Sequence, residues 1–164
     1  VHTFRVRALD KAGNIGESAL KSFEVDNKAP TIRFTKVPGP WIKNQNFTFE
    51  FLAEDEKGIQ TVECKLGAAA FAPCDSVMTH AVSGLAEGNH RFSIRATDKA
   101  GNRSPEVNAD FGVDLTLPVI AFLQEPPAAV IAGSAVSLNF SVTDVLSGVK
   151  GATCSLNGAA TACA

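Results

Sequence analysis

Short runs of alternating apolar and polar residues, separated by turn-forming residues, make up most of the chain. In the clearest run, residues 46–53, Phe47, Phe49 and Phe51 face one way while Thr48 and Glu50 face the other. Similar short apolar runs occupy residues 4–8, 31–34, 62–66, 71–74, 81–85, 90–97 and 109–114. A parallel α/β sheet would need continuously apolar strands instead. The pattern therefore predicts an all-β protein.

A five-residue turn sequence recurs along the chain. Asp98-Lys99-Ala100-Gly101-Asn102 appears unchanged at residues 10–14, each time after an alternating run and before a second one. Each copy predicts a hairpin in which the Asp side chain caps the turn and the Gly supplies a positive φ. Residues 2–38 align without a gap with residues 90–126, and 16 of the 37 positions are identical. A period of 88 residues indicates a whole domain repeated in tandem.

The repeat divides the chain into three parts. Residues 1–26 carry the last two strands of one repeat, 27–114 a complete repeat, and 115–164 the beginning of a third. About seven short strands in one repeat predict an immunoglobulin-like β-sandwich with Greek-key connections. The short linker at residues 26–30, which ends in a proline, predicts that neighbouring repeats are held end to end as a stiff rod.

Both terminal parts are incomplete repeats. A lone hairpin such as 1–26 is marginally stable in water. Residues 115–164 lack the strands that would cover Phe122, Leu138 and Phe140. We expect that the parent chain continues on both sides; the alternative is that the ends pair between copies by strand complementation.

Composition excludes several function classes. Charged residues make up 20% of the 164 residues, and the formal net charge of −2 comes with no Lys/Arg-rich run, so we expect no nucleic-acid partner. No apolar run approaches the ~18–20 residues of a membrane span. No nucleophile or acid/base arrangement stands out from the turn chemistry, so we expect no enzyme activity and no required cofactor.

The four cysteines occur as one pair in each of two repeats. Cys64 and Cys74 flank a predicted hairpin, and Cys154 and Cys163 flank the same hairpin in the next repeat. Hairpin strands bring such residues within disulfide range. Free thiols and a metal site are the alternatives, but there is no Cys-x-x-Cys pair. We expect two disulfides, and therefore an oxidising compartment.

Acidic residues are expected to gather at the junctions between repeats, because the loops concerned share one pole of an immunoglobulin-like sandwich. The residues predicted at the first junction are Asp26, Asp55, Asp98 and Asn102, and at the second Asp114 and Asp144. Calcium prefers such oxygen ligands from loops, which makes Ca²⁺ a candidate ion. The alternative, which we favour here, is that each Asp caps its own turn.

Two further side chains are singled out by their positions. His90 opens the sixth strand, where sandwiches often place a corner tyrosine, and we expect a structural role for it. Trp41 has no counterpart in the third repeat. It is either a contact residue for a partner or, as we favour, a residue that leans on its own domain.

The run from Leu85 to Asn102 resembles the pattern of bacterial immunoglobulin-like repeats, as do residues 63–74 and the Asp114-x-x-x-Pro118 opening. Such repeats occur in large secreted or surface-anchored proteins, as stalks, adhesins or accessory modules. The resemblance implies a non-catalytic structural or adhesive module, extracellular or on the cell surface. Its partners would be the neighbouring repeats, and it would act as a stiff spacer or fibre segment. The alternatives are a recognition module that binds carbohydrate or a cell-surface protein through loops and Trp41, and a self-associating filament subunit.

Overall fold

The structure is a computed structural model that describes residues 1–124 and 127–163. Residues 125, 126 and 164, which include the last two aligned positions of the repeat, lie outside the described residues. Every regular element among the described residues is a β-strand, and they contain no helix suited to crossing a membrane. The strands are β1 (His2–Phe4), β2 (Arg7–Leu9), β3 (Ile15–Glu17), β4 (Lys21–Phe23), β5 (Thr31–Lys36), β6 (Trp41–Ile42), β7 (Phe47–Glu54), β8 (Ile59–Leu66), β9 (Ala72–Pro73), β10 (Thr79–Val82), β11 (Gly88–Asp98), β12 (Val107–Val113), β13 (Val119–Phe122), β14 (Phe140–Thr143), β15 (Cys154–Leu156) and β16 (Ala159–Thr161).

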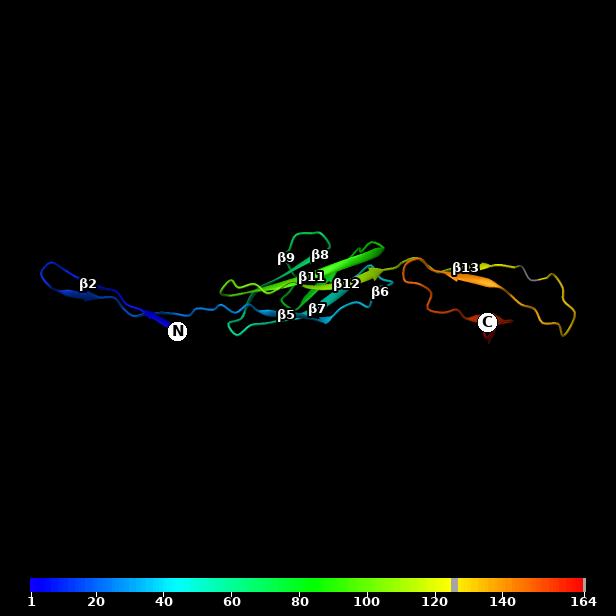
Figure 1. The fold of residues 1–164 in the computed structure, drawn as a ribbon, viewed down its shortest axis with the longest axis horizontal. Helices are drawn as coiled ribbons and strands as arrows, with labels where there is room; N and C mark the ends of the chain where they lie inside the picture. The colour runs from blue at the N-terminus through cyan, green and yellow to red at the C-terminus, as the bar shows by residue number, and fades with distance from the viewer. Residues whose placement is uncertain (125–126, 164) are drawn as a thin grey trace. The chain divides into compact units, whose positions relative to one another are not determined.

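Strands β5 to β12 form two sheets within residues 27–114 (Figure 1). One sheet has the order β10-β7-β5 and the other the order β6-β12-β11-β8-β9. Strand β5 pairs antiparallel with β7, and β8 pairs antiparallel with β11, whereas β6 joins β12 in parallel. This arrangement is an immunoglobulin-like β-sandwich, and the predicted fold class is confirmed.

The core of the sandwich consists of the inward side chains of the alternating runs. Phe49 and Phe51 of β7 and Phe92 and Ile94 of β11 are essentially inaccessible to solvent. The rings of Phe49 and Phe92 stack with their centroids 4.0 Å apart, which joins β7 of one sheet to β11 of the other. Each such side chain contributes roughly 1.5–3 kcal/mol by its burial.

By contacts, the chain divides into two compact units. The first comprises residues 1–37, 48–81 and 91–109, and the second residues 38–47, 82–90 and 110–164. The first unit contains the linker at 26–30 together with the loops of residues 55–58 and 98–102. The second contains the linker at 114–118 and the loop of residues 144–148. Each junction therefore lies inside one unit.

Two details of the sandwich differ from the sequence-based expectation. The fifth predicted strand, 81–85, is instead β10 at 79–82, because Gly84 takes a positive φ and the amide of Leu85 donates to the carbonyl of Gln45. Leu85 is buried without being in a strand. The two-residue strand β6 was not predicted, so the complete repeat has eight strands rather than seven.

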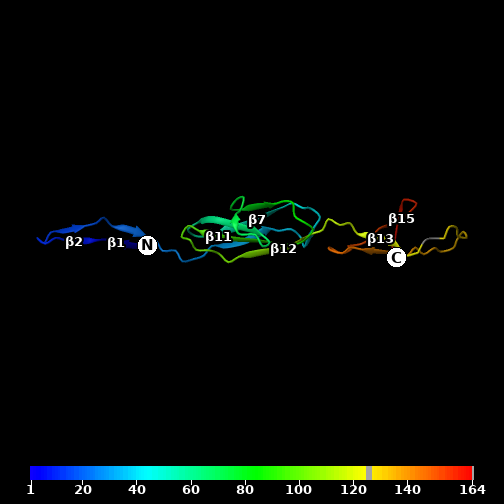
Figure 2. The same ribbon diagram turned by 90° about the horizontal axis from the view of Figure 1, so that it is seen from above.

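Among the described residues, each terminal segment consists of two two-stranded sheets. In the N-terminal segment, β1 pairs with β4 and β2 with β3 (Figure 2). In the C-terminal segment, β13 pairs with β14 and β15 with β16. The predicted exposure is confirmed for Phe122 and Leu138, which are 61% and 47% exposed, whereas Phe140 is half-buried.

Candidate functional site

The recurring Asp-Lys-Ala-Gly-Asn turn has the same hydrogen bonds in both copies. Asp98 Oδ1 accepts from the amides of Ala100 and Asn102 at 2.9 and 2.8 Å, and its Oδ2 accepts from Asn102 Nδ2 at 2.8 Å. Asp10 makes the equivalent three bonds with Ala12 and Asn14. Gly101 has a φ of +96°, which a side chain would strain. The turn-capping interpretation is therefore confirmed for Asp98.

The Asp98 carboxylate is fully buried, yet it is held in its charged form. Burial by itself raises its pKa, but the side-chain amide of Asn102 and the backbone amides of the turn together lower the pKa below its usual value. The turn therefore keeps a negative charge at the junction at neutral pH.

Three carboxylates meet at this junction. Each of Asp26, Asp55 and Asp98 offers one carboxylate oxygen, and the three oxygens lie within 4.8 Å of one another. Asp26 comes from the linker, Asp55 from the loop after β7, and Asp98 from the end of β11. The structure therefore brings these three acids together at one junction, as predicted.

Two of the three acids also accept hydrogen bonds from backbone amides of their own loops. Asp55 Oδ1 accepts from the amides of Lys57 and Gly58, and Asp26 Oδ1 accepts from the amide of Lys28. Asp26 Oδ2 is buried and has no hydrogen-bond partner among the described residues. A buried carboxylate oxygen without a partner is costly, so this atom is suited to a cation or a water molecule.

The Asn102 side chain bridges the complete repeat and the linker before it. Its Nδ2 donates to the backbone carbonyl of Asp26 at 3.1 Å as well as to Asp98. Asn102 therefore contributes its amide N–H to the junction, while its role as a calcium ligand remains a prediction.

Two ion pairs lie beside the three carboxylates. Lys57 Nζ lies 2.6 Å from Glu24 Oε2, which belongs to the preceding repeat, and Lys28 Nζ lies 2.9 Å from Glu56 Oε1. Glu56, and to a lesser extent the nearby Asp26 and Asp55, raises the pKa of Lys28. Because each lysine is paired with a glutamate, the two pairs add no net charge to the junction. These pairings could not be predicted from the sequence, since no spacing pattern marks such a long-range surface pair.

The second junction holds its linker by a different set of bonds. Asp114 Oδ1 accepts from the amide of Thr116, and its Oδ2 accepts from the amide of Ser147, in the repeat that follows. Hydrogen bonding by Ser147, chiefly from its side chain and to a lesser extent from its amide, is the main reason why the pKa of Asp114 lies below its usual value. Asp144 Oδ1 accepts from the amide of Gly148 at 2.7 Å and from the hydroxyl of Ser147. Asp114 and Asp144 are thus both tied to the loop of residues 144–148.

Glu87 is a linker contact that the sequence did not indicate. Its Oε1 accepts three bonds from the linker, namely from the amides of Leu115 and Thr116 and from the Thr116 hydroxyl, the last at 2.6 Å. A lone acid between Ala86 and Gly88 carries no periodic signal, so only the structure identifies this role.

Trp41 is half-buried and packs on its own repeat. It lies opposite Gly112 in the parallel pairing of β6 with β12, and a Cβ on Gly112 would overlap the indole ring. The indole therefore needs a glycine beneath it. Partner binding through Trp41 remains a prediction.

The other residues singled out have structural contacts. Disulfides join Cys64 to Cys74 and Cys154 to Cys163, with Cα atoms 5.3 and 5.4 Å apart. His90 Nε2 lies 2.7 Å from the carbonyl oxygen of Ala86, and its ring stacks on Phe111, as expected of a corner residue.

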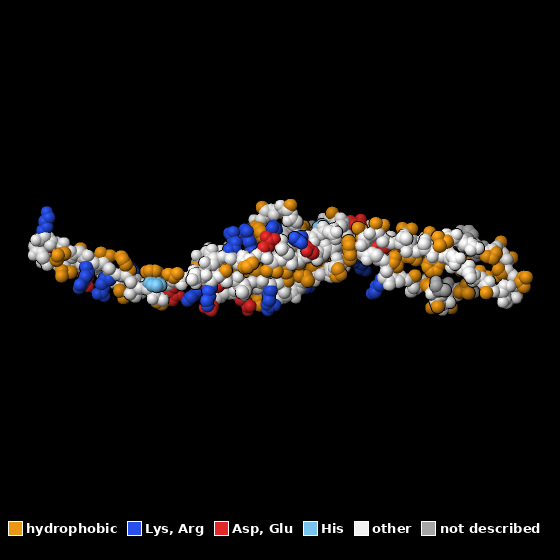
Figure 3. All heavy atoms as spheres, in the orientation of Figure 1, with side chains coloured by type: hydrophobic (Ala, Val, Ile, Leu, Met, Phe, Trp, Pro, Cys, Tyr) orange, Lys and Arg blue, Asp and Glu red, His pale blue; other side chains and the backbone are white. Residues whose placement is uncertain are grey.

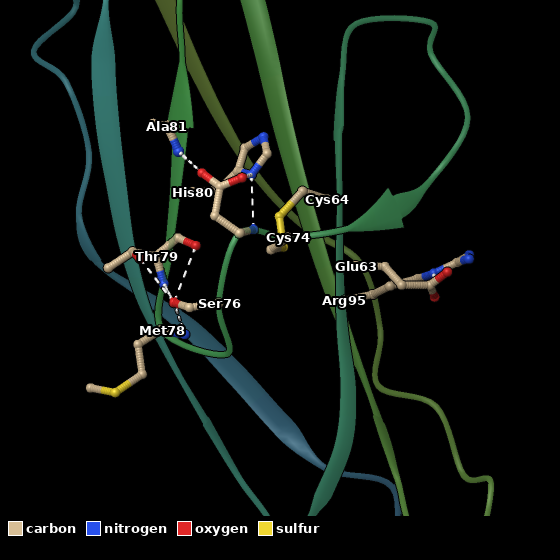
Figure 4. Close-up of a disulfide and its surroundings, with 10 residues drawn as sticks. Glu63, Cys64, Cys74, Ser76, Met78, Thr79, His80, Ala81 and Arg95 are labelled. Carbon is tan, nitrogen blue, oxygen red and sulfur yellow. Dashed lines mark hydrogen bonds and ion pairs between the residues drawn. A yellow bond between two sulfur atoms is a disulfide. The ribbon is translucent and has the colours of Figure 1, made fainter.

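One group of side chains near the first disulfide has the residue types of a catalytic triad (Figure 4). His80 Nδ1 lies 3.2 Å from a carboxylate oxygen of Asp75, but the Ser76 hydroxyl bonds with Thr79 and the amide of Met78 instead of with the imidazole. The Ser76 hydroxyl is therefore engaged in the turn of residues 76–79 and is not bonded to the imidazole.

The similarity of this chain to known proteins is distant. The chain matches no protein-family model and no curated protein sequence. A solved structure of fibronectin(III)-like modules of Clostridium thermocellum CbhA aligns with 20% sequence identity and a TM-score of 0.44. The alignment covers 69% of this chain and 63% of that one, so the chain spans less than two thirds of the neighbour. The assignment to the immunoglobulin-like β-sandwiches rests on the sheets and core described above.

Proposed function

We propose that the chain is a non-catalytic segment of tandem immunoglobulin-like repeats of the bacterial kind, which acts as a stiff spacer in an extracellular or cell-surface protein. The observation that carries this proposal is that both linkers are bonded to folded loops. The first linker accepts from Asn102 at the Asp26 carbonyl, and the second is bonded by Glu87 and, at Asp114, by Ser147. The two disulfides support an oxidising location.

The bonded linkers favour stiffness for a physical reason. A flexible linker leaves its polar groups to water and samples many conformations. Here Pro30 is fully buried, and the Lys57–Glu24 pair ties the residue that follows β4 to the loop after β7. An exposed pair of this kind contributes at most about 1 kcal/mol, so the stiffness must come from several contacts acting together.

Nitrogen relaxation measurements on the whole chain test the spacer proposal. We expect the amides of residues 1–25 and those of residues 31–113 to report the same rotational correlation time. The Asn102→Ala and Lys57→Ala double variant should shorten the correlation time of the first segment, because it removes both contacts across the junction. Lys65→Ala is the control, since the Lys65–Glu106 pair lies within the complete repeat. Independent tumbling of the two segments in the unmodified chain would rule out a stiff junction.

We further propose that the first junction binds one Ca²⁺ through Asp26, Asp55 and Asp98. Three charged oxygens from different loops suit this ion, and the unpartnered Asp26 Oδ2 fits a cation. Sites of this kind in extracellular modules have dissociation constants of about 10⁻⁴–10⁻³ M. The ion would neutralise like charges and fix the linker to the repeat that follows it. Asp114 and Asp144 offer the same kind of carboxylate oxygens at the second junction. Binding of a second Ca²⁺ ion per chain would indicate that they hold one as well.

Calorimetric titration and thermal unfolding test the calcium proposal. At 10 mM Ca²⁺ we expect about 1.4–2.7 kcal/mol of stabilisation relative to EDTA, as mass action gives for dissociation constants of about 10⁻³–10⁻⁴ M. Asp55→Asn should remove this gain. Glu50→Gln, which removes an exposed charge elsewhere on the repeat, should retain it. A melting temperature that does not respond to EDTA, or an equal response to Mg²⁺, would count against the site and leave the spacer proposal standing.

A further inference from the structure

The outer edge of strand β10 is covered by the turn that precedes it. β10 ends its sheet, so one side of its backbone faces no neighbouring strand among the described residues. The amide of Phe51 in β7 donates to the carbonyl of Met78, so Met78 faces β7. Because backbone groups alternate in direction along a strand, Thr79 and Ala81 present their amides on the opposite, outer side. Such outward groups are what an edge strand leaves open to other chains.

Asp75 and Ser76 occupy this outer side. Figure 4 shows the Ser76 side chain beside Thr79, where Ser76 Oγ accepts from the Thr79 amide at 2.8 Å. The Ser76 amide in turn donates to the Thr79 carbonyl at 3.1 Å. Asp75 Oδ2 accepts from the Ala81 amide at 2.7 Å. Both outward amides of β10 are therefore already bonded within the chain.

The position of Asp75 is fixed from two directions. Asp75 follows Cys74 directly, and the disulfide to Cys64 joins Cys74 to β8. The Asp75 amide donates to His80 Nδ1 at 3.3 Å, and a carboxylate oxygen of Asp75 lies 3.2 Å from the same nitrogen. The His80 ring lies parallel to the buried ring of Phe92, with the centroids 5.5 Å apart. The covering turn is thus anchored by a covalent bond at its start and by a ring that packs on the core.

The other edges of the complete repeat are protected by different means. Figure 3 shows charged side chains of both signs on the surface of this repeat. Strand β5 ends in Lys36 and has an irregular register between Phe34 and Lys36, whereas β6 and β9 have two residues each, one of them Pro73. Charges, bulges, prolines and very short strands all hinder the addition of a further strand. The four residues of β10, Thr-His-Ala-Val, include no Lys, Arg, Asp, Glu or Pro, so this edge needs a cover from outside the strand.

We propose that Asp75 and Ser76 form a strap that closes the β10 edge and prevents another chain from adding a strand there. An added strand would need the Thr79 and Ala81 amides, which the strap already engages. The chain that the strap excludes is a second copy, because two β10 edges can pair antiparallel about a two-fold axis and each offers the same groups. In the tandem arrangement proposed above, like edges are kept at high local concentration, and misassembly between repeats is a characteristic failure of such proteins.

Hydrogen exchange on the whole chain tests whether the strap closes the edge. In the Asp75→Ala, Ser76→Ala double variant at low protein concentration, we expect peptides that span residues 79–82 to exchange at least ~10-fold faster, because two outward amides lose their acceptors. The Asp75→Asn, Ser76→Thr double variant keeps both acceptor oxygens and should exchange like the unmodified chain. Unchanged exchange in β11 shows that the repeat is folded. Equal exchange at residues 79–82 in the two double variants would overturn the proposal.

Sedimentation velocity tests what the strap prevents. The Asp75→Ala, Ser76→Ala chain should associate at concentrations at least ~10-fold lower than the unmodified chain, as several added backbone hydrogen bonds would give. Adding Ala81→Pro to this variant removes one outward N–H at a position where an edge strand tolerates proline. Association should then return to the level of the Asp75→Asn, Ser76→Thr control. Association that removal of the strap leaves unchanged, or a gain that Ala81→Pro does not reverse, would contradict the proposal.

Discussion

Replacement of Phe92 by alanine is expected to lower the free energy of unfolding of the complete repeat by about 3–5 kcal/mol. The ring is fully buried and stacks on Phe49, and its centroid lies 5.5 Å from that of the His80 ring in a parallel arrangement. Its removal leaves a cavity between the two sheets, which stiff neighbouring strands cannot close. Because domains are stable by about 5–15 kcal/mol, this single change takes a large share of the total.

Equilibrium urea unfolding of the whole chain, followed by a spectroscopic signal from the complete repeat, measures this loss in the free energy of unfolding. The matched control is Phe71→Ala, since Phe71 is only half-buried and contacts the Arg95 guanidinium and the Lys65 ammonium over its ring face. That change should cost about 1 kcal/mol, the usual size of such a cation–π contact at a partly exposed site. Similar losses in the free energy of unfolding for the two variants would mean that the buried Phe92 ring contributes no more to stability than the partly exposed Phe71 ring.

Replacement of Gly112 by alanine should destabilise the same repeat by about 2–3 kcal/mol, the upper part of the range for overpacking. The added methyl group would overlap the six-membered ring of Trp41, so β6 must shift away from β12 or the indole must leave its place. The two-residue pairing of β6 with β12 gives little resistance to such a shift, and the hydrogen bond that the Gly112 amide donates to the Pro40 carbonyl would be lost with it.

A double-mutant cycle identifies the cause. In a Trp41→Ala background the ring is absent, so Gly112→Ala should cost less than about 1 kcal/mol there. Gly151→Ala is the control for a glycine replacement in open space, since a Cβ at that position meets no atom within 4 Å. A full cost of Gly112→Ala in the absence of Trp41 would show that the backbone, and not the indole, requires the glycine.

The alternating runs predicted the strands well wherever one face is buried. The run at 46–53 differs by one residue from β7, because the burial of Phe49 and Phe51 enforces the period of two. Strand β6 could not be predicted in this way, since two residues that pair in parallel with a strand some 70 positions later leave no local pattern. Leu85 was assigned to a strand because it is apolar, although Gly84 turns the chain before it.

The candidate site could be predicted only as far as the fold places loops together. The order of strands in a sandwich is enough to bring Asp26, Asp55 and Asp98 to one pole, and the structure contains that cluster. The contacts of Glu87 with the second linker depend on which rotamer a single exposed side chain adopts, and no sequence pattern encodes that choice.

The bond from Asn102 to the Asp26 carbonyl has a consequence for how an array of repeats would lose its structure. The turn that makes this bond belongs to one repeat, and the acceptor belongs to the linker before it. Unfolding of a repeat therefore frees the linker on its N-terminal side and leaves more distant repeats intact, as in a one-dimensional chain with nearest-neighbour coupling. Under tension such an array would yield stepwise, and each step would lengthen the chain by one repeat while its neighbours continued to bear the load.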